Sequence, residues 1–557
     1  MRPAGSDAER TARGWNPLTL ALLAGVWIAA LPNWPLWQAL LALPETASVR
    51  GAVFVAGFGA MVAALTSALL ALFAWRATIK PAIALLLLAA AVGAHFMGTY
   101  GVVIDTTMMT NVVQTDPREV RDLLSLRLFV TVLMLAGVPL LALWRVPVAR
   151  TRWLAQAGRN LLGIGAALLL LLALVFALFA DLSATMRNHR SMRYLINPVN
   201  SLYALGDLAA QSKAKPGGPP APIGLDARIA PRAAGQRPPM LVLVIGETAR
   251  ADHFALNGYA RPTNPELAAL DVISFRNVSS CGTNTAASLP CMFSHLGRVA
   301  FGARERDHEN LLDLVQRAGL AVLWLDNQAG CKGLCARVPN AFARDAVAGA
   351  PALPASLCDG EECLDAALLH DLDARIAALP AAARERGVLL VLHQMGSHGP
   401  AYAKRSPPER KPFGPECTTN VLQQCDHQAL INAYDNSIAY TDHVLAQTIH
   451  WLKQQQSGFD TSLLYVSDHG ESLGENNLYL HGLPYAVAPV EQKHVPMLLW
   501  FGARAADDGQ VRVDCLRAQR DVALTHDNLF HSALGVLGIT ASEYKRPLDA
   551  LAPCRAP

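Results

Sequence analysis

The sequence predicts a protein of two parts, in which helices that cross a membrane are followed by an exported α/β domain. The chain of 557 residues is 52% hydrophobic and only 16% charged, whereas a typical soluble protein is about 25% charged. The apolar residues gather in long uncharged stretches near the N-terminus, and all ten cysteines lie at or after Cys281. The length also exceeds that of one ordinary compact domain, so we expect at least two units.

Five stretches before Asp181 contain no Asp, Glu, Lys or Arg, and each is expected to span the membrane. A helix needs about 20 mainly apolar residues to cross a bilayer, and buried core helices of a soluble protein would not account for five such stretches. The first stretch lacks an Ala-x-Ala cleavage site followed by a soluble domain, so we expect it to be retained. The predicted transmembrane domain covers 1–181, with spans at about 15–35, 51–75, 81–104, 128–144 and 160–180.

The distribution of Lys and Arg predicts the orientation of these spans. Basic residues are favoured in cytoplasmic connections. With a cytoplasmic N-terminus, nine basic residues of the short connections lie inside, and only Arg50, Arg118, Arg121 and Arg127 lie outside. Five spans then export everything after Asp181. Ten cysteines also suit an oxidising compartment, so two independent signals agree.

A connecting region and an α/β domain are expected after the spans. Within 182–239, basic and aromatic residues indicate helix at a membrane surface, and the Pro/Gly-rich stretch from Lys213 to Pro239 indicates an irregular linker. From 240 to 557, apolar runs alternate with helical stretches, which is typical of a mainly parallel sheet covered on both faces. Strands are expected at 241–245, 321–325, 388–392, 463–466 and 497–501. With a net charge of +3 and no basic stripe, the chain is not expected to bind nucleic acid.

Acidic residues follow two of the predicted strands. Glu247 comes directly after the first strand, and Asp468 and His469 follow another. Ligands of open α/β sheets bind beyond the carboxyl ends of the strands. Two carboxylates and an imidazole suit Zn²⁺ at a catalytic site with an open coordination position. Either acidic residue alone is more simply explained as a helix N-cap, but the combination favours a metal site.

A third motif runs from residue 280 to 293: Ser-Cys-Gly-Thr-Asn-Thr-Ala-Ala-Ser-Leu-Pro-Cys-Met-Phe. The small and hydroxyl residues before Ala-Ala-Ser indicate a helix start, whose free N–H groups favour a phosphate. A threonine hydroxyl is a poor nucleophile unless it loses its proton, which metal coordination promotes. An ordinary N-cap is the alternative interpretation of this motif.

These motifs closely resemble those of the lipid A phosphoethanolamine transferases. The resemblance includes Gly-Glu-Thr-Ala-Arg, Ser-Asp-His-Gly-Glu-Ser, Gln-Met-Gly-Ser-His-Gly-Pro and the Ile-Asn-Pro-Val-Asn connection. That family contains intrinsic enzymes and mobile colistin-resistance enzymes of Gram-negative bacteria. The resemblance runs over nearly the whole chain. It implies a multi-pass inner-membrane protein that acts as a monomer, with an alkaline-phosphatase/sulfatase-like domain at 240–557 in the periplasm.

The resemblance also implies a role for individual residues. Thr285 matches the nucleophile, and His393 matches a histidine near the metal whose role is less defined. Four residues match the ligands of the principal zinc: Glu247, Thr285, Asp468 and His469. Three match residues that contact the phosphate, the donor head group or a second zinc: Lys332, His398 and His481. Three in the exported loop after the third span match positions that bind phosphatidylethanolamine: Asn111, Thr115 and Glu119.

The implied reaction has two steps at one threonine. Thr285 would displace diacylglycerol from phosphatidylethanolamine and become a phosphothreonine diester. A lipid A phosphate oxygen would then attack and release the threonine, which implies ping-pong kinetics. Transfer to the 1- and/or 4′-phosphate would lower the negative charge that attracts polymyxins.

Other functions remain open from the residues alone. Transfer to lipopolysaccharide core sugars or to periplasmic glucan is one alternative, and a membrane-anchored phosphatase or phosphodiesterase is another. A sulfatase is disfavoured because the chain has no Cys-x-Pro-x-Arg sequence. A non-catalytic membrane sensor is disfavoured because the Glu, Thr, Asp and His set is intact.

The ten cysteines fall into five close pairs along the sequence. Ten cysteines permit many connectivities, and the family's similar pattern implies pairing between neighbours. A zinc–cysteine site at Cys331 and Cys335 is the alternative, although export favours disulfides. The implied bridges are Cys281–Cys291, Cys331–Cys335, Cys358–Cys363, Cys417–Cys425 and Cys515–Cys554.

Overall fold

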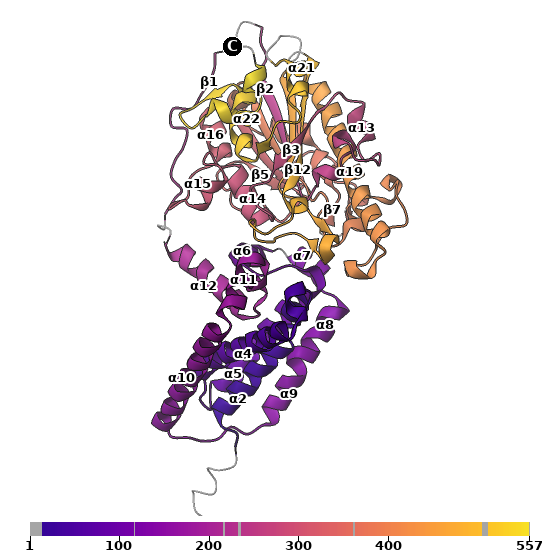
Figure 1. Cartoon of the computed structure of the whole chain (residues 1–557). Helices are drawn as coiled ribbons and strands as arrows, with labels where there is room; N and C mark the ends of the chain where they lie inside the picture. The colour runs from indigo at the N-terminus through magenta and orange to yellow at the C-terminus, as the bar shows by residue number, and fades with distance from the viewer. Residues whose placement is uncertain are drawn as a thin grey trace, which may run out of the picture. The chain divides into compact units, whose positions relative to one another are not determined.

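The computed structural model describes residues 14–555 except 116, 215–217, 232–234, 360–361 and 504–510. It divides into two compact units. The helical unit comprises Met1–Met109 and Leu124–Ala209, and the α/β unit comprises Thr110–Leu123 and Ala210–Pro557. Both are drawn in Figure 1, where the helical unit is indigo to purple.

The helical unit contains the helices that are long and apolar enough to cross a membrane. Among the described residues there are four such helices, or five if a bent pair counts as one span. They are α4 (Val49–Ala71), α5 (Ile79–Tyr100), the helix Leu126–Arg145 and α10 (Trp153–Ala177), with the bent pair α2 (Pro17–Ala30) and α3 (Trp34–Leu41).

The first predicted span is bent rather than continuous. It breaks between α2 and α3, which differ in direction by 47°. Pro32 and Pro35 lie at this break, and proline both lacks an N–H and collides with the preceding helical turn. Side chains satisfy the carbonyls that the break leaves free: Asn33 Nδ2 donates to the Ile28 carbonyl at 2.8 Å, and Trp37 Nε1 donates to the Ala29 carbonyl at 2.9 Å.

The fourth span contains an irregular turn. Its parts are α8 (Leu126–Val132), a π-helical turn (Leu133–Gly137) and α9 (Val138–Arg145). Pro139 has no N–H, so the Leu135 carbonyl one turn earlier lacks its α-helical donor. The indole N–H of Trp27, in α2, donates to this carbonyl at 3.0 Å. A side chain of one span therefore completes the backbone of another.

The connection after α10 is mainly helical. It contains α11 (Phe179–Asn188), a 3₁₀ turn (Arg190–Leu195) and α12 (Val199–Ala214). Asn197, in the Ile-Asn-Pro-Val-Asn motif, is fully buried. Its Nδ2 donates to the carbonyls of Pro32 at 3.0 Å and Ala90 at 2.6 Å. This motif therefore fixes the connection to the break in the first span and to α5.

The α/β unit is built on one eight-stranded sheet. Strands β9, β2, β8, β4 and β5 run parallel as neighbours, which confirms the predicted mainly parallel sheet. Strand β12 is antiparallel to both of its neighbours. In spatial order the strands are β13 (Leu524–Thr525), β3 (Ile273–Ser279), β12 (His494–Phe501), β9 (Asp460–Ser467), β2 (Pro239–Gly246), β8 (Val388–His393), β4 (Ala321–Asp326) and β5 (Asn340–Phe342).

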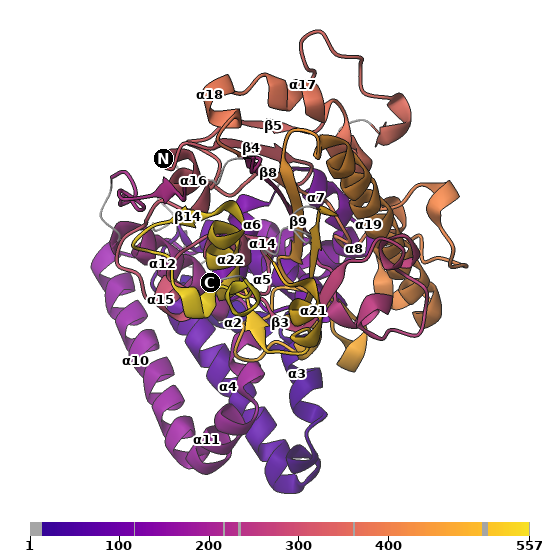
Figure 2. The ribbon, with the colours of Figure 1, turned by 90° about the horizontal axis from the view of Figure 1, so that it is seen from above.

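Helices cover both faces of this sheet. Because strand side chains alternate between faces, Leu241 and Leu243 belong to one buried cluster and Val242 and Val244 to the other. The first face is covered by α14 (Thr285–Met292), α16 (Leu311–Arg317) and α22 (Asp527–Leu537), and the second by α17 (Leu372–Ala377) and α19 (His427–Gln455). Figure 2 shows α16 and α19 on opposite sides of β8 and β9.

The remaining elements are short. The helices are α6 (Thr106–Gln114), α7 (Pro117–Leu123), α13 (Pro265–Ala268), α15 (Arg298–Gly302), α18 (Ala381–Arg384) and α21 (Val513–Ala518). The two-stranded pairs are β1 (Arg228–Ile229) with β14 (Ile539–Thr540), β6 (Cys358–Asp359) with β7 (Glu362–Cys363), and β10 (Ser472–Leu473) with β11 (Tyr479–Leu480).

All ten cysteines are paired in the structure, and each bridge joins neighbours in sequence. The bridges are Cys281–Cys291, Cys331–Cys335, Cys358–Cys363, Cys417–Cys425 and Cys515–Cys554. Among the described residues no cysteine is free.

Candidate metal centre and nucleophile

Two neighbouring parallel strands bring the candidate ligands together. Strand β2 ends at Gly246 and β9 ends at Ser467, and these two residues are partners in the ladder. The next residues are Glu247 on one strand and Asp468 and His469 on the other, so they emerge side by side at one edge of the sheet. All three are completely buried.

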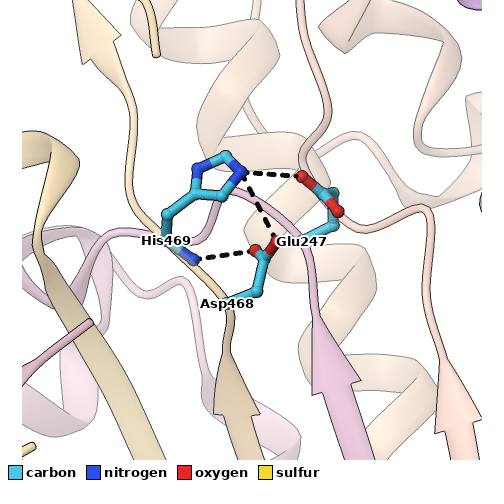
Figure 3. Close-up of side chains that lie close together, drawn as sticks. All are labelled: Glu247, Asp468 and His469. Carbon is cyan, nitrogen blue, oxygen red and sulfur yellow. Dashed lines mark hydrogen bonds and ion pairs between the residues drawn. The ribbon is translucent and has the colours of Figure 1, made fainter. Parts of the chain in front are cut away.

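The three side chains point toward one another (Figure 3). His469 Nε2 lies 3.2 Å from Glu247 Oε1 and 3.5 Å from Asp468 Oδ2. The backbone N–H of His469 donates to Asp468 Oδ1 at 2.8 Å. One possible ligand atom from each residue lies within 4.8 Å of the others, which is close enough for all three to bind one ion.

The polar atoms of this cluster fit a divalent metal. Asp468 Oδ2 and His469 Nε2 are buried and have no hydrogen-bond partner in the structure, although buried polar atoms are normally paired. His469 Nδ1 lies 2.9 Å from the Gly470 carbonyl, and donation to this carbonyl leaves Nε2 unprotonated and free to bind a metal. Carboxylate and imidazole are common ligands of catalytic zinc. The residues present therefore fit the ion predicted from the sequence.

The charges of the cluster support the same conclusion. Burial and the neighbouring Glu247 carboxylate raise the pKa of Asp468. Burial alone would raise the pKa of Glu247, but in the absence of a metal the positive charge of a protonated His469 lowers it. Two buried carboxylates side by side repel each other, and a divalent cation between them would remove this repulsion.

Thr285 stands at the start of α14 and faces the cluster. Its side chain is buried, and its Oγ1 donates to Glu247, with both carboxylate oxygens at 3.2 Å. The preceding residue, Asn284, caps the helix by accepting the Ala287 N–H at 2.9 Å. The predicted helix start is thus present at 285, and the threonine hydroxyl lies beside the candidate metal ligands rather than serving as the cap.

The Glu247 backbone is held by a strained turn. Thr248 has a φ of +53°, which is rare for a β-branched residue. Its N–H donates to Asp468 Oδ1 at 3.3 Å. The Tyr434 hydroxyl, from α19, donates to the Thr248 carbonyl at 2.7 Å and accepts the Arg250 N–H at 2.9 Å. The turn therefore directs one more donor into the cluster, and α19 stabilises it.

Two histidines of the sequence analysis lie next to the cluster. The His481 ring centroid is 4.3 Å from that of His469 and 5.7 Å from that of His398. Burial and the charge of His469 lower the pKa of His481 to about 3, so this ring is neutral. Its Nδ1 is 3.2 Å from Glu471 Oε1, which orients its Nε2 away from Glu471.

His393 is placed differently from these two. It ends β8, the strand beside β2, and is completely buried. Its Nδ1 is 2.9 Å from Asp326 Oδ2, and Asp326 also accepts the Trp324 indole N–H. The Nδ1 atom of this ring therefore faces Asp326 at the end of β4.

Lys332 contacts the segment Thr110–Leu123 within the α/β unit. Lys332 Nζ donates to the Gln114 carbonyl at 3.2 Å. In the same segment, Thr115 Oγ1 donates to the Asn111 carbonyl at 2.8 Å, which is a bond within one turn of backbone. The side chain of Glu119 lies outside the described residues. The predicted roles of Asn111, Thr115 and Glu119 in donor binding therefore stay predictions.

The segment that carries this loop is anchored by Asp122. The Asp122 carboxylate is buried and pairs with Lys404 at 2.6 Å and with Arg405 at 3.3 Å. Asn420 Nδ2 donates to the Asp122 carbonyl at 2.7 Å. These contacts explain why Thr110–Leu123 belongs to the α/β unit although its neighbours in sequence belong to the helical unit.

Three buried residues near the site were not singled out from the sequence. Gln328 Nε2 lies 3.3 Å from Glu247 Oε2. Its position just after a predicted strand could have indicated that it belongs to the site. Glu471 lies two residues after His469, and only its burial distinguishes it from an exposed acidic residue. His526 carries no local signal, because its partners are far away in the sequence.

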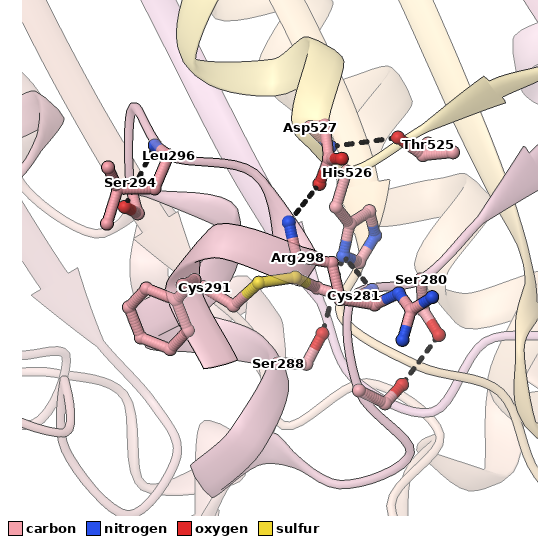
Figure 4. The surroundings of a disulfide bond; sticks show 12 residues. Ser280, Cys281, Ser288, Cys291, Ser294, Leu296, Arg298, Thr525, His526 and Asp527 are labelled. Carbon is pink, nitrogen blue, oxygen red and sulfur yellow. Dashed lines mark hydrogen bonds between the residues drawn. A yellow bond between two sulfur atoms is a disulfide. The ribbon is translucent and has the colours of Figure 1, made fainter. Parts of the chain in front are cut away.

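His526 connects the nucleophile loop to the end of β9. Its Nδ1 accepts the Cys281 N–H at 3.0 Å, and its Nε2 donates to the Ser467 carbonyl at 2.9 Å. In Figure 4 it lies beside the Cys281–Cys291 bridge, which spans Thr285 in sequence. The Ser288 hydroxyl of α14 also donates to the Asp468 carbonyl. These contacts fix the position of Thr285 relative to Asp468 and His469.

Two family models match the chain. The model described as sulfatase matches residues 239–539, which is most of the α/β unit. The model described as phosphoethanolamine transferase EptA/EptB matches residues 62–212.

Individual proteins match over nearly the whole chain. The phosphoethanolamine transferase EptA of Escherichia coli K12 is 39% identical, over 97% of this chain and 97% of its own. The phosphatidylethanolamine transferase Mcr-1 of Escherichia coli is 38% identical, over 96% and 97%. The solved structure of an integral membrane protein, lipooligosaccharide phosphoethanolamine transferase A from Neisseria meningitidis, has a TM-score of 0.89 at 32% identity and covers 97% of this chain and 99% of its own.

Proposed function

The chain belongs to the lipid A phosphoethanolamine transferase family, and from this membership we propose that it transfers phosphoethanolamine from phosphatidylethanolamine to a phosphate of lipid A. One observation of the site carries the proposal. The Thr285 hydroxyl lies 3.2 Å from Glu247 in a buried cluster with Asp468 and His469. This arrangement places a nucleophile beside a ligand set that fits zinc.

The first half of the proposed reaction takes place at Thr285. When bound, zinc supplies a Lewis acid that polarises a phosphate oxygen and lowers the pKa of a coordinated hydroxyl. Thr285 Oγ forms a bond to the donor phosphorus, and the bond from phosphorus to diacylglycerol breaks. The proton that Thr285 loses is balanced by the proton that diacylglycerol gains. The free N–H groups at the start of α14 are placed to bind the phosphate.

The second half regenerates the threonine. A phosphate oxygen of lipid A attacks the same phosphorus, and Thr285 Oγ leaves and regains a proton. The His481 ring lies next to His469, and the His398 ring lies next to His481. These two histidines are proposed to bind the donor head group or to hold a second zinc. Lys332 and the loop carrying Asn111, Thr115 and Glu119 are the proposed donor-binding residues.

The proposed location follows from the excess of basic residues in alternate connections and from the ten paired cysteines. The N-terminus lies in the cytoplasm, the apolar helices span the bacterial inner membrane, and the α/β unit lies in the periplasm. There both lipid substrates share one membrane surface with the enzyme, which is proposed to act as a monomer.

Mass spectrometry of lipid A tests this function. Cells that express the protein should gain the mass of one phosphoethanolamine on lipid A and bind polymyxin less, because each added ammonium offsets a phosphate charge. Cells that express Thr285→Ala should not, and Thr285→Ser, which keeps a hydroxyl, is the matched control. If the added mass were found on core sugars or glucan instead, the acceptor would be that component of the envelope and not lipid A. Normal modification by Thr285→Ala would overturn the mechanism.

A further inference from the structure

Two cationic side chains lie against one aromatic ring near the nucleophile loop. The Arg298 guanidinium is 4.1 Å from the centroid of the Tyr485 ring, and Lys493 Nζ is 5.2 Å from it. Arg298 opens α15, whereas Tyr485 and Lys493 belong to the connection between β9 and β12. Separate parts of the chain thus bring two positive charges to one place.

This positive charge is not neutralised by ion pairs. Over the described ranges, neither Arg298 nor Lys493 forms an ion pair with a carboxylate; the Lys493 ammonium donates to the Tyr485 carbonyl at 3.4 Å. The nearest acidic contact is made by backbone, since Asp527 accepts the N–H of Arg298 at 2.8 Å. Partial burial and the charge of Arg298 lower the pKa of Lys493, while Glu491 opposes this. Two like charges held together in this way favour an anion between them.

The cluster is joined to the nucleophile loop by hydrogen bonds. The Tyr485 hydroxyl donates to the Ser280 carbonyl at 3.0 Å, and the Thr283 hydroxyl donates to the Leu483 carbonyl at 2.6 Å. The chain from His481 to Tyr485 therefore runs along the loop that leads to Thr285. Four residues span at most about 14 Å, so the cluster lies within the reach of a disaccharide from the histidines. Figure 4 shows Arg298 among the residues around the Cys281–Cys291 bridge.

We propose that Arg298, Tyr485 and Lys493 form a subsite for the phosphorylated saccharide of the acceptor. The inference rests on the function proposed above, in which one acceptor phosphate attacks at Thr285. A second phosphate on the same saccharide needs cationic partners, and the planar guanidinium of arginine suits a phosphate in particular.

Charge distinguishes this ligand from the donor. Phosphatidylethanolamine is zwitterionic, with its ammonium and phosphate nearly cancelling, so a site with two cations gains little by binding it. An acceptor with two phosphates carries several negative charges and gains much more. The subsite therefore serves the second half of the reaction and not the first.

The test measures the two half-reactions separately on the full chain in detergent. The variants are Arg298→Ala and Lys493→Ala, and Lys453→Ala, which removes an exposed lysine in the last turn of α19, is the matched control for net charge. Release of diacylglycerol from labelled phosphatidylethanolamine in the absence of acceptor reports the first half. Transfer to lipid A with two phosphates, and to lipid A with one, reports the second.

Each subsite variant should release diacylglycerol at the wild-type rate. The KM for lipid A with two phosphates should rise about tenfold or more, as expected for loss of one charge-assisted hydrogen bond. The KM for lipid A with one phosphate should change much less, so the wild-type preference for two phosphates should disappear. A folding defect would affect both acceptors equally and cannot produce this loss of preference.

Three results would overturn the subsite. One is an equal loss of transfer with both acceptors, which would indicate that Arg298 only stacks on Tyr485 to hold the loop. Another is a matching loss of diacylglycerol release, and a third is an equal effect of Lys453→Ala. Wild-type protein that releases diacylglycerol but modifies no lipid A would instead overturn the proposed acceptor, and the subsite with it.

Discussion

At the scale of single residues, the site consists of buried side chains that contact one another. Glu247, Asp468 and His469 are completely buried, and Thr285 is nearly so. Each contacts at least one of the others within 3.5 Å. Replacing any of them by a shorter side chain changes the chemistry of the cluster more than its packing.

Thr285→Ala should remove transfer activity and leave the fold nearly unchanged. The substitution removes the nucleophilic oxygen, and loss of a nucleophile typically lowers turnover by about a thousandfold or more. The hydroxyl has Glu247 as its partner, so the free energy of unfolding should fall by no more than about 1 kcal/mol. Diacylglycerol release and thermal unfolding of the same preparation check both parts. A large loss of stability would show that the missing activity reports unfolding.

His526 should make the stability of the α/β unit depend on pH. Burial lowers the pKa of this ring to about 3, compared with about 6.5 in an unfolded chain. Because the unfolded state binds the proton more tightly, the contribution is intact above pH 6.5 and is lost as the pH falls toward 3. At pH 5 the loss amounts to about 2 kcal/mol.

His526→Gln provides the comparison, since its amide can still donate to the Ser467 carbonyl but does not titrate. Denaturant unfolding at pH 7 and pH 5 should show a smaller loss of stability for the variant than for the wild type. Equal losses in the two proteins would contradict the assignment of this pH dependence to His526.

At the scale of elements, the site depends on how strands, turns and one long helix meet. Strands β2 and β9 are parallel neighbours, so the residues after them emerge together. Helix α19 then supports the turn after β2 through the Tyr434 hydroxyl. Helix α19 therefore stabilises the strained turn at Thr248, although it contributes no candidate metal ligand.

Tyr434→Phe should destabilise the unit and weaken metal binding together. The substitution leaves the Thr248 carbonyl and the Arg250 N–H buried without their partner, at an expected cost of about 1–3 kcal/mol. Because the Thr248 turn adjoins Glu247, zinc affinity should fall as well. Unfolding measurements and zinc titration test the two effects. Tyr440→Phe, six residues further along the same helix, is the control. An unchanged zinc affinity in Tyr434→Phe would contradict the proposed link between the turn and the metal site.

The elements also show how far the sequence predicts the fold. Five strands and the residues after β2 and β9 were predictable because continuous apolar runs followed by acidic residues are local patterns. The two-residue strand β13 and the antiparallel direction of β12 depend on pairing with distant strands. The break at Pro32 was marked by its prolines, yet whether a proline bends or ends a span depends on side chains such as Asn33 that take over the free carbonyls.

Dependence on distant parts of the chain also explains why some site residues could not be predicted from the sequence. Gln328, Glu471 and His526 are polar residues that would ordinarily be exposed. Their burial arises from contacts with residues that lie far away along the chain, such as Glu247 for Gln328 and Cys281 for His526. No local pattern records contacts of this kind.

At the scale of the whole molecule, metal binding and folding of the α/β unit should be coupled. A ligand that binds only the folded state stabilises it according to its concentration relative to Kd, by about 2.7 kcal/mol at a hundredfold excess. Chelation should therefore abolish transfer and lower the melting temperature, and added Zn²⁺ should restore both. Glu247→Gln should show a much smaller shift with zinc. Full activity and an unchanged melting temperature after complete removal of metal would refute the zinc site.

Because Trp27 donates to the Leu135 carbonyl, the effect of a substitution at Trp27 should depend on which residue occupies position 139. Pro139 creates the vacancy, and Trp27 fills it from another span. Pro139→Ala restores a local donor and should make Trp27 dispensable, so Trp27→Phe should harm the parent but be tolerated in the double variant. Evolution could then exchange the pair only in one order, with the proline lost before the tryptophan. Expression and thermal stability of the two single variants and the double variant would reveal this order.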